Sequence, residues 1–199
     1  MSYSDCQNNE QYVFNKMTDK QIIEQTKDWL WELTEPRDEF SGFGICPFLK
    51  KELTNDDMKF VILRGQDNSY GPNFKKGLDD WIEENKYNSI LFICIGDIWE
   101  HIERKDYQLK LQKLMKENGY EDYKALCFSP YEDRTAAGVK TRAGSPYFLI
   151  NIMSSTDLGK AHESIVKTKY FDNFTKQELI DIKIYGKNTK KALDIDKIN

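Results

Sequence analysis

The residues best placed to do chemistry lie in one long connection, residues 129–146, which reads SPYEDRTAAGVKTRAGSP. It carries cationic side chains at Arg134, Lys140 and Arg142, and it opens with the hydroxyl of Ser129. Guanidinium and ammonium groups bind phosphates and carboxylates through charge-assisted hydrogen bonds. Long connections in compact domains usually bind or cover a ligand. The segment therefore predicts a site for an anionic small molecule.

The same connection contains two adjacent acids, Glu132 and Asp133. A carboxylate can act as a general acid or base, and we assign that role to Asp133. Adjacent side chains usually point apart, so the two acids do not form a paired acid–base site by themselves. They can equally pair with the arginines of the connection or lie in a solvated turn, and the sequence leaves these alternatives open.

Cys46 is the second reactive candidate, because it directly precedes Pro47. Proline is favoured at the first position of a helix, so a short helix over residues 47–53 puts Cys46 at its N-cap. The unpaired N–H groups and the dipole of a helix N-terminus favour a thiolate. Cys46 is therefore a candidate nucleophile. The alternative is a small buried residue between a helix and the sheet, since free cysteine is among the most buried residue types.

The other polar residues do not predict a metal or nucleotide site. His101 and His162 lie far apart in the sequence, and we expect both at the surface. No C-x-x-C pair and no phosphate-binding glycine pattern occurs. We predict no metal site and leave any cofactor undefined. The four cysteines are spread along the chain: Cys6, Cys46, Cys94 and Cys127.

Composition predicts the setting of these residues. The chain has 199 residues, of which 39% are hydrophobic, and a formal net charge of −4. This is typical of one globular domain and disfavours a nucleic-acid surface. Residues 1–15 contain no apolar signal segment, and the longest apolar run, residues 90–95, is too short to span a bilayer. We expect a cytoplasmic protein without nucleic-acid or membrane partners, with a flexible leader at residues 1–17 and one domain at residues 18–199.

The hydrophobic pattern predicts alternating helices and strands. Strands are expected at residues 58–63, 89–95, 123–128 and 147–152. Helices are expected at residues 19–33, 47–53, 73–84, 97–117, 157–167 and 175–182, with a helical turn or tail at 187–194. This order predicts a single α/β or α+β domain, with a mixed sheet of about four strands and helices packed on it. Open α/β sheets bind ligands at the carboxyl ends of strands, where the connection 129–146 begins.

Five short motifs follow one another along the chain: GICPF at 44–48, SILFIC at 89–94, CFSP at 127–130, SPY at 145–147 and GKN at 186–188. Together they resemble a bacterial family of unknown function whose members carry Cys-Pro-Phe, Phe-His-Pro and Arg-Ser/Ala-Pro-Tyr-Pro motifs. The resemblance spans residues 27–195, and it implies a shared fold without a defined activity.

This chain departs from the family pattern at the polar positions. Ser129 stands where the family has a histidine before proline, and Gly144 stands where it has an arginine. Asn151 and Met153 fall near the histidine and arginine that the family carries in the next strand. If those groups bind metal or transfer protons in the relatives, this protein has lost or rebuilt that chemistry.

Two functions follow from these observations. The first is an enzyme-like domain that binds an anionic ligand between residues 129–146 and Cys46, with Cys46 as nucleophile and Asp133 as acid or base. The second is a non-catalytic binding or regulatory interaction module that keeps the fold but has lost the family's polar site. The length and charge of the connection favour the first function, and the missing histidines and arginine favour the second.

Overall fold

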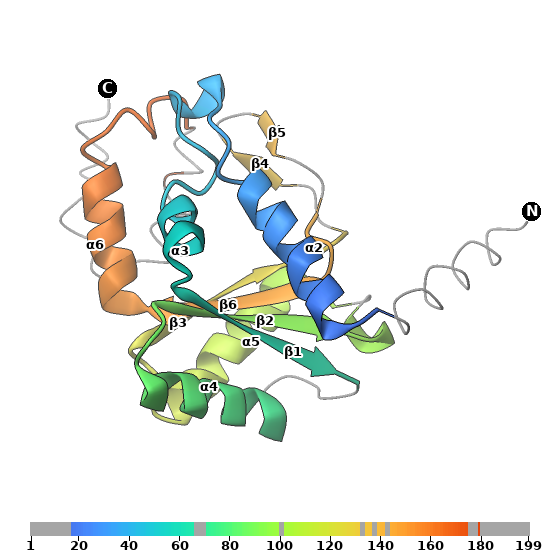
Figure 1. Ribbon diagram of the computed structural model, residues 1–199. Coiled ribbons are helices and arrows are strands. Elements are labelled where there is room, and N and C mark those ends of the chain that lie inside the picture. The colour runs from blue at the N-terminus through green and yellow to red at the C-terminus, as the bar shows by residue number, and fades with distance from the viewer. Residues whose placement is uncertain are drawn as a thin grey trace, which may run out of the picture.

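The protein forms a single α+β domain, in which helices pack around one four-stranded mixed sheet (Figure 1). The expected fold class is therefore confirmed. The computed structural model describes residues 17–65, 71–99, 102–131, 134–136, 139–141, 144–174 and 179. The expected leader, apart from Met17, and the elements expected at 175–182 and 187–194, apart from residue 179, lie outside these residues.

The sheet contains strands β1 (Met58–Arg64), β2 (Ser89–Ile95), β3 (Tyr123–Phe128) and β6 (Phe148–Ser154), in the order β1-β2-β6-β3. β1 and β2 are parallel, and β6 runs antiparallel to both of its neighbours. The carboxyl ends of β1, β2 and β3 therefore lie at one edge of the sheet, together with the start of β6. This carboxyl edge is where the connection 129–146 leaves and re-enters the sheet.

The middle of the sheet is covered on both faces. All seven residues of β2 are buried, which explains why its sequence is a continuous apolar run rather than an alternating one. In Figure 1, helices α4 (Pro72–Glu84) and α5 (Arg104–Glu117) lie below the sheet. Helices α2 (Asp19–Glu32), α3 (Leu49–Asn55) and α6 (Ser155–Ile165) lie above it. We call these two sides the lower and upper faces.

Each face has its own group of buried residues. The lower cluster joins Phe92 of β2 to residues such as Leu78 of α4 and Leu111 of α5. The upper cluster joins Leu91 of β2 to residues such as Leu30 of α2. A third, smaller cluster packs Phe40 of the 3-10 helix η1 (Asp38–Phe40) against residues that follow α6.

Two helices begin close to where the sequence predicts. Thr18 caps α2, and its hydroxyl accepts a hydrogen bond from the backbone N–H of Gln21 at 3.3 Å. The Gln21 side chain accepts in return from the backbone N–H of Thr18 at 2.9 Å, which completes a capping box. α4 starts with Pro72, in the position that proline favours.

Three predicted helix starts are wrong. The helix expected from residue 97 is divided into a short 3-10 helix η2 (Asp97–Trp99) and α5, whose N-cap is Glu103. The Glu103 carboxylate accepts hydrogen bonds from the backbone N–H groups of Lys105 at 2.7 Å and Asp106 at 3.1 Å. The helix therefore begins at Arg104, capped by a glutamate, and not at residue 97.

The other two helices differ at their first residue. α6 follows β6 directly and is capped by Ser154, not by Asp157. α3 begins at Leu49 with Phe48 as its N-cap residue, so Cys46 is not at the N-cap. Pro47 and Phe48 instead form a turn before the helix.

We expected the connection 129–146 to be a continuous loop. The structure shows that it contains a hairpin instead. Strands β4 (Arg134–Ala136) and β5 (Val139–Thr141) pair antiparallel in a separate two-stranded sheet. Among the described residues, no helix has both the length and the apolar character needed to cross a membrane.

Candidate functional site

The two ends of the connection are packed against each other at the carboxyl edge. A side chain on Gly144 would bring its Cβ to 2.2 Å from the backbone oxygen of Pro130 and to 2.4 Å from that of Ser129. Real Cβ atoms do not approach other atoms so closely, so glycine lets the two backbone segments meet. The family's arginine at this position therefore does not fit here without a shift of the backbone.

Ser129 and Ser145 fix the backbone on either side of this contact. Ser129 is 8% exposed, and its hydroxyl accepts a hydrogen bond from the backbone N–H of Tyr131 at 3.3 Å. The Ser145 hydroxyl donates to the backbone oxygen of Tyr147 at 2.6 Å. Ser129, predicted as a ligand contact, thus has a structural partner within the turn.

The β4–β5 hairpin determines how its cationic residues are arranged. Its register pairs Arg134 with Thr141 and Thr135 with Lys140. Arg134 and Lys140 therefore belong to neighbouring rungs of the ladder and not to the same rung. Asp133 and Arg142, the other two predicted site residues here, lie outside the described residues.

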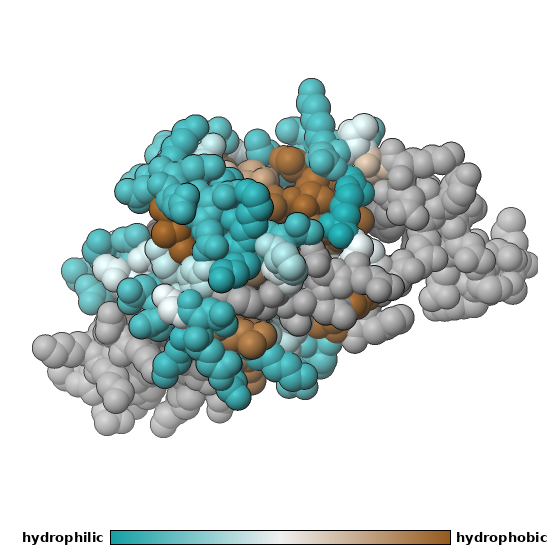
Figure 2. Space-filling view, turned by 90° about the horizontal axis from the view of Figure 1, so that it is seen from below, coloured by the Kyte–Doolittle hydropathy of each residue, from teal (hydrophilic) through white to brown (hydrophobic). Residues whose placement is uncertain are grey.

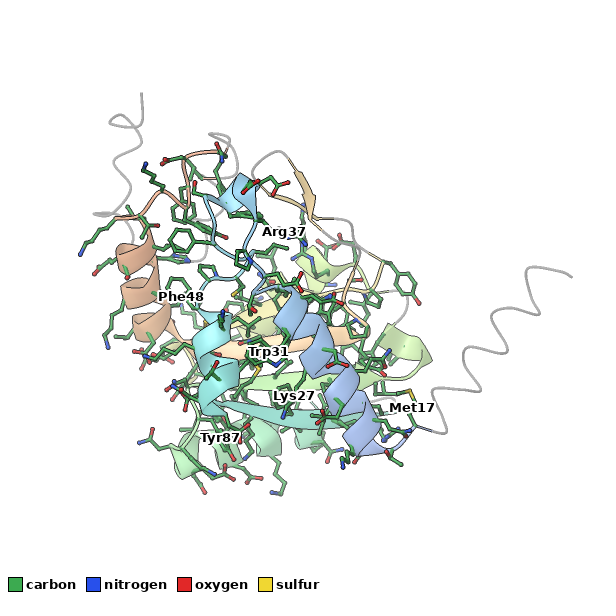
Figure 3. All side chains as sticks on the ribbon, turned by 45° about the horizontal axis from the view of Figure 1, so that its top comes forward. Met17, Lys27, Trp31, Arg37, Phe48 and Tyr87 are labelled. Carbon is green, nitrogen blue, oxygen red and sulfur yellow. The ribbon has the colours of Figure 1, made fainter. Side chains whose placement is uncertain are left out.

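The hairpin lies on the upper side of the molecule, next to the end of α2. Figure 1 and Figure 3 both show it there, near the segment that contains Arg37. The turn that holds Cys46 is attached to the same helix end, because the backbone N–H of Cys46 donates to the backbone oxygen of Leu33 at 3.1 Å. The hairpin and the Cys46 turn are therefore neighbours of one helix terminus, as a shared site requires.

The thiol of Cys46 is not in an activating environment. The side chain is partly buried and packs against the upper cluster. Burial raises its pKa to about 11. The backbone N–H groups of Leu49 and Phe48 lower this pKa, and the carboxylate of Glu52 raises it. Each of these effects is smaller than the effect of burial. Cys46 is consequently a neutral thiol at neutral pH.

The groups around Cys46 include a phenol and a carboxyl. Tyr170 donates a hydrogen bond from its hydroxyl to the backbone oxygen of Ile45 at 2.5 Å, and burial and then Cys46 raise its pKa. Glu52 accepts a hydrogen bond from the hydroxyl of Ser89 at 2.8 Å, and burial raises its pKa. Neither is a base suited to take a proton from a thiol at neutral pH.

His162 lies on α6 and is partly buried, so our prediction of a surface histidine is wrong for this residue. Burial lowers its pKa. Its Nδ1 is buried and has no hydrogen-bond partner among the described residues. His101 lies outside the described part of the chain. Among the described residues, no three histidine, cysteine or acidic side chains gather in a way that could hold a metal ion.

Sequence reasoning missed a buried polar pair on the lower face of the carboxyl edge. The rings of Trp99, Tyr107 and Phe148 pack together, with centroids 5.2 to 5.6 Å apart. The indole Nε1 of Trp99 and the hydroxyl of Tyr107 are buried, and neither has a hydrogen-bond partner in the described structure. The helical spacing of Tyr107 indicates a core residue, but nothing in the sequence shows that its hydroxyl is left unpaired.

Asn151 is a similar case on the upper face. It is 7% exposed, and its Oδ1 has no hydrogen-bond partner among the residues that the structure describes. Its register partners are Leu91 of β2 and Leu126 of β3. The position that carries a histidine in the resembled family is thus still a buried polar position in this chain.

A groove of about 660 Å³ lies on the other side of the molecule, along α5. Figure 2 views the molecule from below and shows several apolar patches between hydrophilic residues on this side. None of the predicted site residues lines this groove. Its lining comes from α5 and the segment before it: Ile98, Ile102, Glu103, Asp106, Tyr107, Lys110, Lys113, Leu114 and Glu117.

Comparison with protein-family models, with curated proteins and with solved structures finds no match to this chain. The class that the fold defines is therefore the α+β domain described above. The resemblance to the Cys-Pro-Phe family stays a prediction.

Proposed function

We propose that this protein is a cytoplasmic, non-catalytic binding module that holds an anionic small molecule at the β4–β5 hairpin. The proposal keeps the anionic ligand of the enzyme-like domain described above. It takes the absence of catalysis from the alternative, the non-catalytic interaction module. The net charge of −4 supports a small-molecule ligand over a nucleic acid.

The packed base of the connection is the observation that carries this proposal. Gly144 lies against the backbone of Ser129 and Pro130, so the hairpin rises from two chain ends that are held together. A fixed base limits the conformational entropy that the connection loses when it binds a ligand. The segment that it holds contains three cations, Arg134, Lys140 and Arg142, and two acids.

The state of Cys46 argues against covalent catalysis. A thiol with a pKa of about 11 is almost entirely protonated at neutral pH, and only the thiolate attacks an electrophile. The partly buried side chain instead packs as a small apolar residue against the upper cluster.

Thermal unfolding in the presence of a panel of anionic metabolites tests the proposal. A ligand that binds the folded state raises Tm, because it stabilises that state by RT ln(1 + [L]/Kd). Removal of a charge-assisted hydrogen bond is expected to weaken binding roughly 10- to 100-fold. We expect that loss for Arg142→Ala or Arg134→Ala. We expect no change in binding for the control Lys167→Ala, which removes an exposed cation two residues after the end of α6. The proposal fails if no anion raises Tm, or if the hairpin variants bind as well as the control.

The enzyme-like function is the second candidate, and one feature of the Cys46 turn favours it. The backbone N–H groups of Phe48 and Leu49 lower the pKa of the thiol. If closure over a ligand strengthened their effect, Cys46 would act as the nucleophile, with Asp133 as acid or base. Cys46→Ser separates the two functions, because it leaves affinity for the anion unchanged in a binding module. A turnover that this substitution abolishes supports the enzyme.

A further inference from the structure

The groove along α5 is lined by side chains of opposite charge in a fixed order. Its first half carries the acids Glu103 and Asp106, and its second half carries the bases Lys110 and Lys113. Glu117 closes the row, and its carboxylate lies 3.8 Å from the Nζ of Lys113. Between Glu103 and Lys113, the charges that line the groove are therefore negative near the start of the helix and positive in its second half.

The two central charges of this row are not used inside the chain. Asp106 and Lys110 are both exposed and are four residues apart, the spacing at which helical ion pairs form. No ion pair joins them, or joins either to another side chain, within the described residues. Both charges are thus available to a partner whose charges run in the opposite order.

Apolar residues lie beside these charges. Ile98 and Ile102 line the groove before α5, Leu114 lines it in the last turns, and the ring of Tyr107 lies between them. Ile98, Ile102 and Leu114 are each partly buried by the chain's own packing. A partner that continues this packing needs apolar side chains at both ends and charges in the middle.

We infer that this groove is the contact surface for a second copy of the same chain, with the two α5 helices packed antiparallel about a twofold axis. An antiparallel copy places the acidic half of one helix against the basic half of the other, which is the order that the unused charges require. The same surface then serves both protomers, as a twofold interface demands.

One register brings the central charges together with one apolar pair beside them. With the axis at the level of position 108, Asp106 lies opposite Lys110 of the other copy, because each is two residues from the axis. Glu103 and Lys113 lie opposite each other at five residues from it, and Ile102 and Leu114 at six. The symmetry repeats every pair. About this axis, residues 104–112 of the two α5 helices overlap, which is about 13.5 Å of helix.

This inference is independent of the proposed ligand site. The groove is formed by α5 on the lower side, whereas the β4–β5 hairpin lies on the upper side (Figure 1). Loss of anion binding therefore leaves the self-association intact, and loss of association leaves anion binding intact.

A charge swap, read by sedimentation equilibrium of the full chain, tests the pairing. We expect the wild-type chain to dimerise with micromolar affinity. Asp106→Lys and Lys110→Glu each turn two symmetric attractions into repulsions, so each variant alone should associate at least tenfold more weakly. The variant with both substitutions restores opposite charges and should associate within about threefold of wild type. An equimolar mixture of the two single variants should likewise form a mixed dimer.

Lys116→Glu is the matched control, because it makes the same charge change on the same helix outside the groove lining. It should leave the dimer unchanged. All three substituted positions are exposed, and circular dichroism confirms that each variant is folded. A wild-type chain that stays monomeric up to 0.5 mM (on the order of 500-fold above a micromolar Kd) overturns the inference. So does a dimer that the single variants leave unchanged, or a double variant that fails to recover association.

Discussion

The two faces of the sheet are built from different kinds of residues. The lower face is mainly aromatic and aliphatic, with Phe74 and Phe92 packed at a centroid distance of 4.5 Å. Its polar side chains include Gln108 and Gln112 of α5, which bind the backbone of β3. On the upper face, polar groups lie among the apolar ones. Glu52 binds the fully buried Ser89 there, and the hydroxyl of Tyr147 donates to the side chain of Gln25.

We therefore expect stability to depend mainly on the lower face, and the ligand site that we propose adjoins the upper face. Burial of apolar area is the dominant stabilising contribution to folding, whereas buried polar groups contribute little net stability. The Cys46 turn and the hairpin, which carry the candidate site, adjoin the side that already contains polar groups. Four pairs of substitutions break or sharpen this contrast.

Phe92→Ala in the lower cluster should have the largest effect. Phe92 is fully buried, and its substitution removes a ring and leaves a cavity, which typically costs about 3–5 kcal/mol of unfolding free energy. The neighbouring Leu91, equally buried but on the upper face, gives the matched variant Leu91→Ala, with an expected loss of about 2–4 kcal/mol. Urea unfolding measures both losses. A larger loss for Leu91→Ala would contradict the contrast between the faces.

Gly144→Ala should come next, because the new Cβ collides with the backbone of Pro130. Forcing extra atoms into a packed site costs about 1–3 kcal/mol. The variant should also weaken anion binding, since it displaces the base of the hairpin. Ser145→Ala is the companion change, which removes only the hydroxyl that donates to Tyr147. Denaturant unfolding measures the loss of stability, and ligand-induced Tm shifts measure the loss of anion binding. If Gly144→Ala left the stability unchanged, the base of the hairpin would not be packed.

The Glu52 carboxyl should make stability depend on pH. Burial raises its pKa above the ordinary value of 4.5, so the folded state binds its proton more tightly than the unfolded state does. Stability from this group is present below pH 4.5 and is lost as pH rises through the raised pKa. Glu52→Gln should flatten that part of the stability profile.

Ser89→Ala is the sharper form of the same test. It removes the hydrogen bond that lowers the pKa of Glu52, so it should steepen the loss of stability with rising pH. At neutral pH the variant should be about 1–3 kcal/mol less stable, because the carboxylate loses its partner. Unfolding measured from pH 4 to pH 8 gives both profiles; identical slopes for wild type and Glu52→Gln would exclude a buried carboxyl.

Tyr107→Phe should have the smallest effect. Its buried hydroxyl has no hydrogen-bond partner in the described structure, so its removal should change stability by less than about 1 kcal/mol, or increase it. Tyr107→Leu, which removes the ring as well, is the control for packing. A loss above about 2 kcal/mol on Tyr107→Phe would show that the hydroxyl does have a partner.

The sequence predicts the sheet well because its strands are short, strongly apolar segments. The run of β2 indicates a strand covered on both faces, and the structure buries every residue of it. Helix starts are predicted less well, since several side chains near each start can act as the cap. Glu103 and Ser154 take that role, whereas the sequence predicts helix starts near Asp97 and Asp157.

For the candidate site, the sequence could predict only which segments lie near each other. Arg134, Lys140 and Cys46 identify the two segments that adjoin the end of α2, but their chemistry depends on burial and register. The register that separates Arg134 from Lys140 comes from a hairpin whose six residues give no strong strand signal. The raised pKa of Cys46 depends on how the upper cluster covers it, which a local motif does not show.

Alkylation of Cys46 by iodoacetamide, followed from pH 6 to pH 10 by peptide mass spectrometry, tests the central claim of binding without a cysteine nucleophile most directly. With a pKa of about 11, the thiolate fraction is roughly 100-fold below that of a thiol at the reference value of 9.0. We predict a slow rate that rises about tenfold per pH unit up to pH 10, while the buried Cys94 and Cys127 stay unmodified. A rate that levels off below pH 8 would reveal an activated thiolate and would contradict the account.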